Sequence, residues 1–413
     1  MIQPVHLATG FAEEWFSLNV SNGSVVFSVV PSIGGRVMDL SLGPTRVFYT
    51  NPRLRGKAIS GSPSSESSLG RNYGGSKVWP APQGWSSERE WPGPPDPVLD
   101  CGPYDWQAAL DPDAAIIHLR SPHDEYSGIT MRREIRINGA SSSVEVLHTM
   151  ENTSRRPVRW SIWQVTQVDA SKGLEIFVPA KGFHQTFGDQ LYPAVSFSAA
   201  EQRVRLQYVD QVAKLAVEAD QGWFASLDRA RGFVLAETFP FTPGASYPDG
   251  ASAAFWVSGR GTFILHGDQV DMSAGAGGSD PHVETEIMSP LTHLKPAEGF
   301  QFRTAWHLAA IDAQEIVSVN HCGAIGASLA VQPGSPARFT GSFGTFWDAS
   351  LQLVAYDRAS RIVGRFDLGE VSPRRPVRLD NDIGLPPYTV RCSLVLFDSD
   401  HKQLGVLDRV NLH

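Results

Sequence analysis

Cysteine, basic charge and long apolar runs are all scarce in this chain of 413 residues. Its three cysteines, Cys101, Cys322 and Cys392, are too few and too scattered for a disulfide framework or a zinc site. We therefore expect reduced thiols, although one pair could still form a bridge, and we expect no metal and no cofactor. A net charge of −8, without any block of lysine or arginine, argues against nucleic acid as the main partner.

Export and membrane signals are also missing. The N-terminus, MIQPVHLATGFAEEWF, lacks the basic start and the apolar core of a signal peptide. No apolar run approaches the length of a membrane span. We expect a cytoplasmic protein without a membrane partner, and only a trimmed export signal is left open.

The sequence has no convincing amphipathic helix, and almost every readable segment alternates with the period of a strand. Residues Ser24–Val30 and Arg36–Leu42 flank a turn with two glycines, which predicts a hairpin. A second hairpin is predicted where Asn138-Gly139 joins two alternating segments, Thr130–Ile137 and Ser143–Met150. The chain is therefore predicted to be all-β.

The spacing of the strands divides the chain into two expected units. Some fifteen strands with long loops in residues 1–312 indicate a large antiparallel β-sandwich. Seven short, regularly spaced strands in residues 313–413 indicate a small immunoglobulin-like sandwich. That second unit carries no catalytic grouping, so we expect it to serve in packing or dimerisation. A homo-oligomer is compatible with this pattern.

The most unusual segment runs from Arg71 to Tyr104. Seven prolines fall between Pro80 and Pro103, and tryptophans stand within or just beyond the segment. Proline disfavours helix and strand pairing, whereas a flexible linker would not carry so many indoles. We predict a stiff, ordered loop that binds a sugar, because flat aromatic faces beside polar groups suit a sugar ring. The alternative is a loop that closes one end of a sheet, with its tryptophans in the core. The binding residues predicted here are Arg71, Asn72, Lys77, Trp79, Gln83, Trp85 and Trp91.

Two predicted strands carry further candidates. In the strand that begins at His282, side chains alternate, so His282, Glu284 and Glu286 share one face. Two carboxylates at such a short separation raise the pKa of at least one of them, and a raised pKa suits a general base. The alternative is that these side chains form a solvated strand face. In the second strand Trp163 and Gln167 face one way, and their structural and binding interpretations are evenly balanced.

Three stretches resemble the galactose-mutarotase-like superfamily and, more narrowly, a bacterial family of unknown function with that fold. They are Asn72–Gln83 (NYGGSKVWPAPQ), Asn152–Ser154 followed by Trp160–Val168, and Val283–Glu286 followed by Leu294–Glu298 and Trp306. The resemblance covers roughly residues 20–310. It implies a β-supersandwich with a sugar site on the concave face of one sheet.

The resemblance also implies roles for residues. Aldose mutarotases use a glutamate as general base, for which Glu284 or Glu286 is the candidate, and a histidine as general acid. This chain has Trp163-Gln164-Val165 where that histidine motif stands, and glutamine cannot deliver a proton. We therefore predict a carbohydrate-binding protein that, if it is an enzyme, is a sugar epimerase or mutarotase-type isomerase. Its partner would be a small carbohydrate, with an acidic or oxidised sugar included. A non-catalytic sugar sensor or scaffold, and an accessory of a polysaccharide lyase or hydrolase, are the alternatives.

Overall fold

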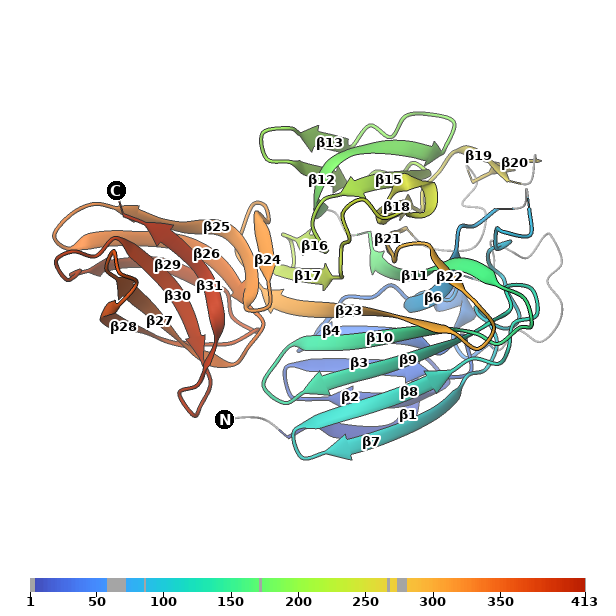
Figure 1. Cartoon of the computed structure of the whole chain (residues 1–413), viewed down its shortest axis with the longest axis horizontal. Helices are drawn as coiled ribbons and strands as arrows, with labels where there is room; N and C mark the ends of the chain where they lie inside the picture. Colours follow the sequence, from blue (N-terminus) through green and yellow to red (C-terminus); the bar gives the residue numbers. More distant parts are fainter. Residues whose placement is uncertain are drawn as a thin grey trace.

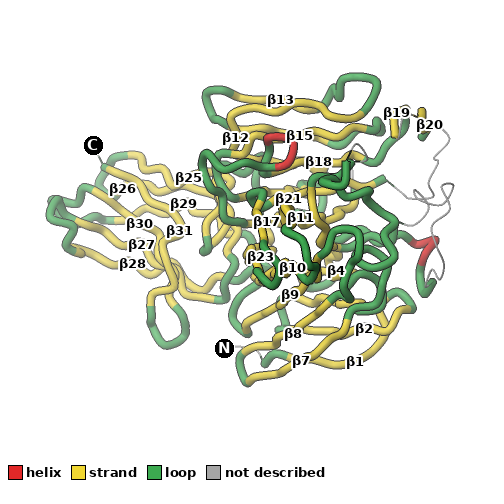
Figure 2. Tube along the Cα trace, turned by 45° about the vertical axis from the view of Figure 1, so that its right-hand side comes forward, coloured by secondary structure: helices red, strands yellow, loops and turns green. Residues whose placement is uncertain are grey.

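The computed structural model describes residues 4–57, 72–84, 87–170, 173–265, 268–272 and 281–412. Within these residues the chain is all-β, as predicted, and its only helical pieces are the 3-10 turns η1 (Pro52–Leu54) and η4 (Pro248–Gly250). No helix in the described part of the chain has the length and apolar character needed to cross a membrane. Figures 1 and 2 show a large body of strands with a smaller one beside it.

The large body consists of two antiparallel sheets. The first sheet runs, in spatial order, through β1 (His6–Ala12), β2 (Trp15–Ser21), β3 (Val25–Val30), β4 (Arg36–Leu42), β6 (Ser76–Ala81), β11 (Val158–Asp169), β21 (His282–Met288), β18 (Ala253–Val257), β15 (Ala213–Ala219) and β12 (Leu174–Phe187). Two short strands, β5 (Thr45–Arg46) and β22 (Thr292–Leu294), pair with β4 and β11.

The second sheet is formed in the same way. Its order is β7 (Asp105–Asp111), β8 (Ala114–Arg120), β9 (Ile129–Asn138), β10 (Ser143–Asn152), β23 (Gly299–Ala310), β17 (Phe233–Thr238), β16 (Trp223–Asp228), β12, β14 (Arg203–Gln207) and β13 (Val195–Ser198). The strand β12 belongs to both sheets, because its first half pairs with β16 and its second half with β15. A separate hairpin joins β19 (Thr262–Leu265) and β20 (Asp268–Asp271).

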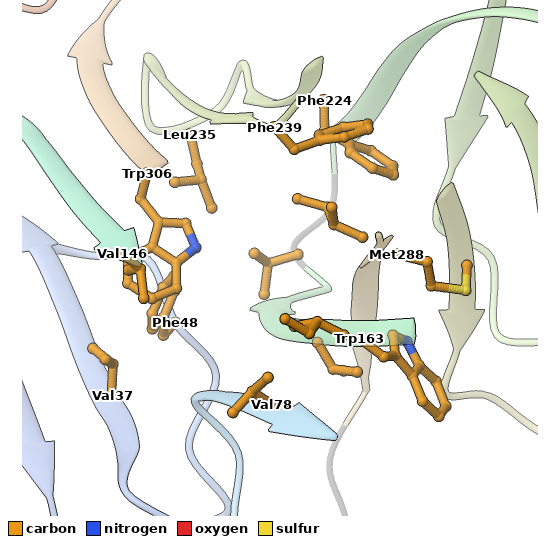
Figure 3. Close-up of a cluster of buried hydrophobic side chains, with 14 of the residues drawn as sticks. Val37, Phe48, Val78, Val146, Trp163, Phe224, Leu235, Phe239, Met288 and Trp306 are labelled. Atoms are coloured by element: carbon orange, nitrogen blue, oxygen red, sulfur yellow. The ribbon is translucent and has the colours of Figure 1, made fainter. Parts of the chain in front are cut away.

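The core of the large body lies between these two sheets. Figure 3 shows part of it, with Val37 and Val78 of the first sheet and Val146, Leu235 and Trp306 of the second. All of these side chains are buried, and burying one large apolar side chain stabilises a fold by about 1.5–3 kcal/mol. The alternation predicted from the sequence sets which residues point into this core.

The smaller body consists of two four-stranded sheets. One contains β24 (Ser318–Asn320), β25 (Gly323–Gln332), β26 (Ala337–Thr345) and β29 (Val377–Ile383), and the other β28 (Ile362–Val371), β27 (Ala349–Tyr356), β30 (Arg391–Phe397) and β31 (Gln403–Asn411). Phe346 anchors this body to the large one: its ring stacks on His307 at 4.8 Å, and its carbonyl oxygen accepts a hydrogen bond from the Ser142 N–H. The two bodies thus share a buried contact.

The structure corrects the prediction in the Trp/Pro segment. Residues Ser76–Ala81 form strand β6, not a loop, and pair with β11 in the middle of the first sheet. Strand β4, on the other side of β6, pairs with β6 only at Ser76. Pro80 is tolerated because no strand on the β4 side requires its missing N–H. The prediction also lacks β1, β2 and β7. Strand β7 is exposed along its whole length and therefore shows no alternation.

Candidate functional site

One face of β6, β11, β21 and β15 collects polar and aromatic side chains. The register places Lys77 and Glu286 on either side of Val165, and it places Gln167 opposite Glu284. Trp163 lies between Trp79 and Met288 in the next row. This face points away from the core between the sheets. The predicted binding residues of β11 and the predicted catalytic residues of β21 therefore lie on one surface.

Glu284 is the centre of a polar cluster on this face. One of its carboxylate oxygens, Oε1, accepts hydrogen bonds from Lys77 Nζ at 2.8 Å and from Gln167 Nε2. Gln167 Nε2 also donates to Asn72 Oδ1 at 2.8 Å, and Asn72 contacts His282 Nε2 at 3.2 Å. The cluster holds Lys77 and Gln167 in fixed positions.

Glu286 and Lys214 form a second buried pair. Lys214 Nζ of β15 lies 3.1 Å from Glu286 Oε2 and 4.5 Å from the ring centroid of Trp163. Lys77 Nζ lies at the same distance from the ring of Trp79. Each ammonium group therefore contacts one carboxylate and one indole. Cation–π contacts add to the attraction of the ion pairs at desolvated positions.

The two glutamates have pKa values shifted in opposite directions. Burial opposes the ionisation of Glu284, but the Lys77 ammonium, His282 and the hydrogen bonds from Lys77 and Gln167 outweigh it and lower the pKa. Burial raises the pKa of Glu286; Lys214 counteracts this rise, while the Glu284 carboxylate adds to it. Burial also lowers the pKa of Lys77, and Glu284 opposes that shift. Glu284 is thus held ionised, and Glu286 is the group suited to proton transfer.

Several buried polar atoms on this face have no hydrogen-bond partner among the described residues. They are Trp79 Nε1, Trp163 Nε1, Gln167 Oε1 and Glu286 Oε1, while the other carboxylate oxygen of Glu286 pairs with Lys214. Buried polar atoms are normally paired, so a group of unpaired ones on one surface requires an explanation. A bound polar ligand would provide these partners.

A hollow of about 40 Å³ opens on this face, and we call it the Trp163 hollow. Its walls are mainly apolar, and three polar side chains line it: Gln83, Lys214 and Asp249. The apolar lining residues are Ala81, Pro82, Trp163, Phe187, Ala216, Pro248, Ala254 and Met288. Trp163 and Met288 lie side by side at one margin of the buried cluster in Figure 3. The volume suits a few water molecules, so a sugar ring requires movement of the exposed rim formed by Gln83 and Asp249.

The remaining predicted residues are placed as follows. Trp91 is completely buried; its ring centroid lies 5.3 Å from that of Trp79, and its N–H donates to Asp96. Trp79 is 3% exposed, so neither indole offers an open face in this structure. Arg71 and Trp85 lie outside the described residues. The burial of Trp91 thus fits the alternative interpretation of this segment, in which its tryptophans belong to the core.

Sequence reasoning missed Lys214 and Asp249. Lys214 stands in the mainly apolar strand β15, AKLAVEA, on the same face as Ala216, and a lysine beside a buried residue of that face is a signal that could have found it. Asp249 precedes Gly250 in a Pro-Asp-Gly turn and has a φ of 52°, a conformation rare outside glycine. Backbone conformations of this kind cluster at ligand sites.

A second buried network lies on the opposite face of β11 and β21. Glu237 Oε2 accepts hydrogen bonds from Thr166 Oγ1 at 2.9 Å and from Trp306 Nε1 and Gln164 Nε2 at 3.2 Å, and Oε1 accepts one from Thr285. Burial, which these hydrogen bonds oppose, raises the pKa of Glu237 to about 7. Gln164 also contacts His148 Nε2 at 2.9 Å. Burial lowers the pKa of His148 to about 3, so this imidazole is neutral.

No three His, Cys, Asp or Glu side chains of the described residues are grouped in a way that could hold a metal ion.

Several solved structures are similar to this chain. Among solved structures, a TPR-domain containing protein from Parabacteroides distasonis aligns with 71% of this chain at 13% identity and a TM-score of 0.50, and the chain spans 46% of that protein. A putative mutarotase from Salmonella typhimurium aligns with 74% of this chain and 94% of its own, at 10% identity and a TM-score of 0.48. A galactose mutarotase-like protein from Clostridium acetobutylicum aligns over 74% of this chain and 99% of its own length, at 10% identity and a TM-score of 0.45.

The first of these structures, at 13% identity, shows a likeness of fold alone. No curated protein is similar enough to this chain to count as a relative. The family model described as a domain of unknown function matches residues 16–309, which is most of the chain and nearly the segment that the resemblance covered. The protein therefore belongs to the family described as the domain of unknown function DUF4380.

Proposed function

We propose that the protein binds a sugar in the Trp163 hollow and that Glu286 and Lys214 form an acid–base pair acting on it. The observation that carries this proposal is the set of unpaired buried polar atoms on this face, from Trp163, which lines the hollow, and from Trp79, Gln167 and Glu286. A fold gains nothing by burying such atoms unpaired, and each costs about 1–3 kcal/mol. Sugar hydroxyl groups both donate and accept, so they suit unpaired donors such as an indole N–H as well as unpaired acceptors.

The lining of the hollow supports the same ligand class. An indole, a phenyl ring and a thioether form apolar walls, while an amide, an ammonium and a carboxylate stand at the edges. This combination suits the apolar C–H faces and the hydroxyl rim of a pyranose. Both lysines on this face are already paired with glutamates, which favours a neutral sugar over an acidic one at this site.

The proposed chemistry is ring opening and closure. Glu286 takes the proton of the anomeric hydroxyl, Lys214 gives a proton to the ring oxygen, the bond between the anomeric carbon and that oxygen breaks, and a carbonyl forms. Closure on the other face of the carbonyl returns both protons and yields the other anomer. Lys214 here supplies the proton that Gln164 cannot give. The raised pKa of Glu286 brings this base closer to neutral pH, where general bases are most effective.

Binding without turnover is the second candidate. It is favoured by one observation, namely that Glu286 is buried beside Lys214 and is not itself among the side chains that line the hollow. A sugar that stays above Lys214 would be held but not deprotonated by Glu286.

One experiment separates these functions. Neutral monosaccharides are screened by thermal shift, and anomer exchange is measured by NMR for each sugar that binds. We expect Glu286→Gln to retain binding and to lose at least about 100-fold in exchange rate, the usual contribution of a general base. Lys214→Gln should lose both. The exposed residues Glu218 and Lys181 provide the controls Glu218→Gln and Lys181→Gln.

Each outcome decides between the candidates. Binding with no exchange above the buffer rate would leave the sugar-sensor function. The absence of a thermal shift with every sugar would overturn both candidates.

A further inference from the structure

A second hollow lies on the outer face of the other sheet, across the core from the Trp163 hollow. It spans β7, β8, β9, β10 and β23, which lie side by side in Figure 1, and it holds about 530 Å³. Ligand pockets usually measure about 300–1,000 Å³. We call it the Arg120 groove; its lining residues are Asp105, Trp106, Gln107, His118, Leu119, Arg120, Arg132, Arg133, Glu134, Leu147, Thr149 and Gln301.

The register shows why its surface is polar. One row across the five strands consists of Asp105, Arg120, Arg132, Thr149 and Gln301, each opposite the next. The next row begins with Gln107, His118 and Glu134. The residues between these rows, such as Leu119 and Phe302, are buried on the inner side. None of the outward side chains is therefore needed for the core.

Arg120 is the least explained residue of the groove. It lies between Asp105 on one neighbouring strand and Arg132 on the other, and the like charge of Arg132 opposes the attraction of Asp105. Arg132 pairs with Glu151, but Arg120 has no ion pair or hydrogen bond of its side chain within the described residues. The other ionic contacts nearby are loose, at 3.7 Å for His118 with Glu134 and 3.6 Å for Arg303 with Glu145. An exposed guanidinium beside a second one is well placed to bind a carboxylate with two parallel hydrogen bonds.

The other groups around Arg120 narrow the ligand class. Gln107, Thr149 and Gln301 supply amides and a hydroxyl. A small anion would use the guanidinium groups alone and leave these amides and the hydroxyl without a role. Five strands at about 4.8 Å spacing span about 19 Å, which is wider than one sugar ring.

We propose that the Arg120 groove binds an acidic oligosaccharide, with Arg120 contacting a uronate carboxylate and the neighbouring amides contacting hydroxyl groups. This site is independent of the Trp163 hollow, since the sheet that carries it lies on the other side of the core. The protein would thus have one site for a single neutral sugar and another for a charged chain.

The test is calorimetric titration of the full chain at low salt, with a galacturonic acid trimer as probe and a neutral galactose trimer for comparison. We expect saturable binding of the acidic trimer, at least tenfold weaker in Arg120→Gln because a charge-assisted hydrogen bond is lost. Binding should be unchanged in Arg159→Gln, which removes an exposed arginine of β11, and in Lys214→Gln, which alters the Trp163 hollow.

Four results would overturn the proposal. They are no binding of the acidic trimer, equal binding of the neutral trimer, equal weakening by Arg159→Gln, and a loss of binding in Lys214→Gln with none in Arg120→Gln. The last result would place the acidic sugar in the Trp163 hollow, and the proposed function would stand without the groove.

Discussion

The two faces of strands β11 and β21 bury polar groups in opposite ways. Toward the core, Gln164, Thr166 and Thr285 all donate to the carboxylate of Glu237, and His148 Nδ1 is the atom of this network that has no partner among the described residues. Away from the core, Gln167 and Glu286 leave oxygen atoms unpaired among the described residues, as do two indole N–H groups. Both faces are buried to a similar degree. Burial alone therefore does not distinguish a structural polar cluster from a binding site, whereas hydrogen-bond saturation does.

The largest expected effect comes from removing the centre of the saturated face. Glu237→Ala leaves the donors of Thr166, Gln164 and Trp306 without their acceptor and opens a cavity, so we expect a loss on the order of 4 kcal/mol in the free energy of unfolding. Urea denaturation measures it. Glu218→Ala, at an exposed position, should change stability by less than about 0.5 kcal/mol. A loss below 1 kcal/mol in Glu237→Ala would remove the distinction between the two faces.

The pH dependence of stability tests the same network. The folded chain holds the proton of Glu237 up to about pH 7, whereas at its ordinary pKa of 4.5 the unfolded chain releases it earlier. Stability should therefore fall as the pH rises from about 4.5 to 7, by roughly 3 kcal/mol from this group. Glu237→Gln should lose this part of the slope, as measured by urea denaturation across that range. Identical slopes in both proteins would contradict the assignment.

Removing the buried charges from the face that carries Glu286 should raise stability, whereas removing Glu237 should lower it. Replacing Glu286 and Lys214 together by methionine removes a buried ion pair with unpaired oxygens, and we expect stability to rise by about 1–2 kcal/mol while sugar binding is lost. Lys214→Met alone leaves Glu286 without its cation and should destabilise the protein. Thermal unfolding compares the three proteins. A double variant less stable than the single one would indicate that the pair is structural.

The smallest effect is expected at the rim of the Trp163 hollow. Gln83 is exposed, so Gln83→Ala should leave stability within about 0.5 kcal/mol and weaken sugar binding about fivefold, the contribution of one hydrogen bond. Calorimetry on the sugar found by the screen measures it. Gln332→Ala, at an exposed position in the smaller body, is the matched control. Equal affinity in both variants would exclude Gln83 from the contact.

Alternation allowed much of the fold and part of the site to be predicted. The hairpin at Asn138-Gly139 and the shared face of Glu284 and Glu286 depend only on local period and turn chemistry, and the structure has both. Strand β6 was missed because proline is a local signal against strands, whereas the sparse pairing beside Pro80 is a property of the whole sheet.

The rest of the site depends on contacts between distant parts of the chain. Lys214 reaches Glu286 across β18, and Glu237 reaches Thr285 across the core, at sequence separations that no period reveals. The opposite pKa shifts of Glu284 and Glu286 arise from those partners. A sequence pattern can therefore show which side chains share a face, but not which of their charges are paired with an opposite charge there.

The position of β21 and β23 has a consequence for synthesis on the ribosome. Both strands lie in the middle of their sheets, yet they are the last strands of the large body to be made. Until residue 310 has left the ribosome, β11 and β18 on one sheet, and β10 and β17 on the other, lack the neighbour that joins them. The nascent chain therefore exposes the edges of β10 and β11 from an early stage and those of β17 and β18 later, and such edges invite aggregation. We expect this order of strands to slow folding.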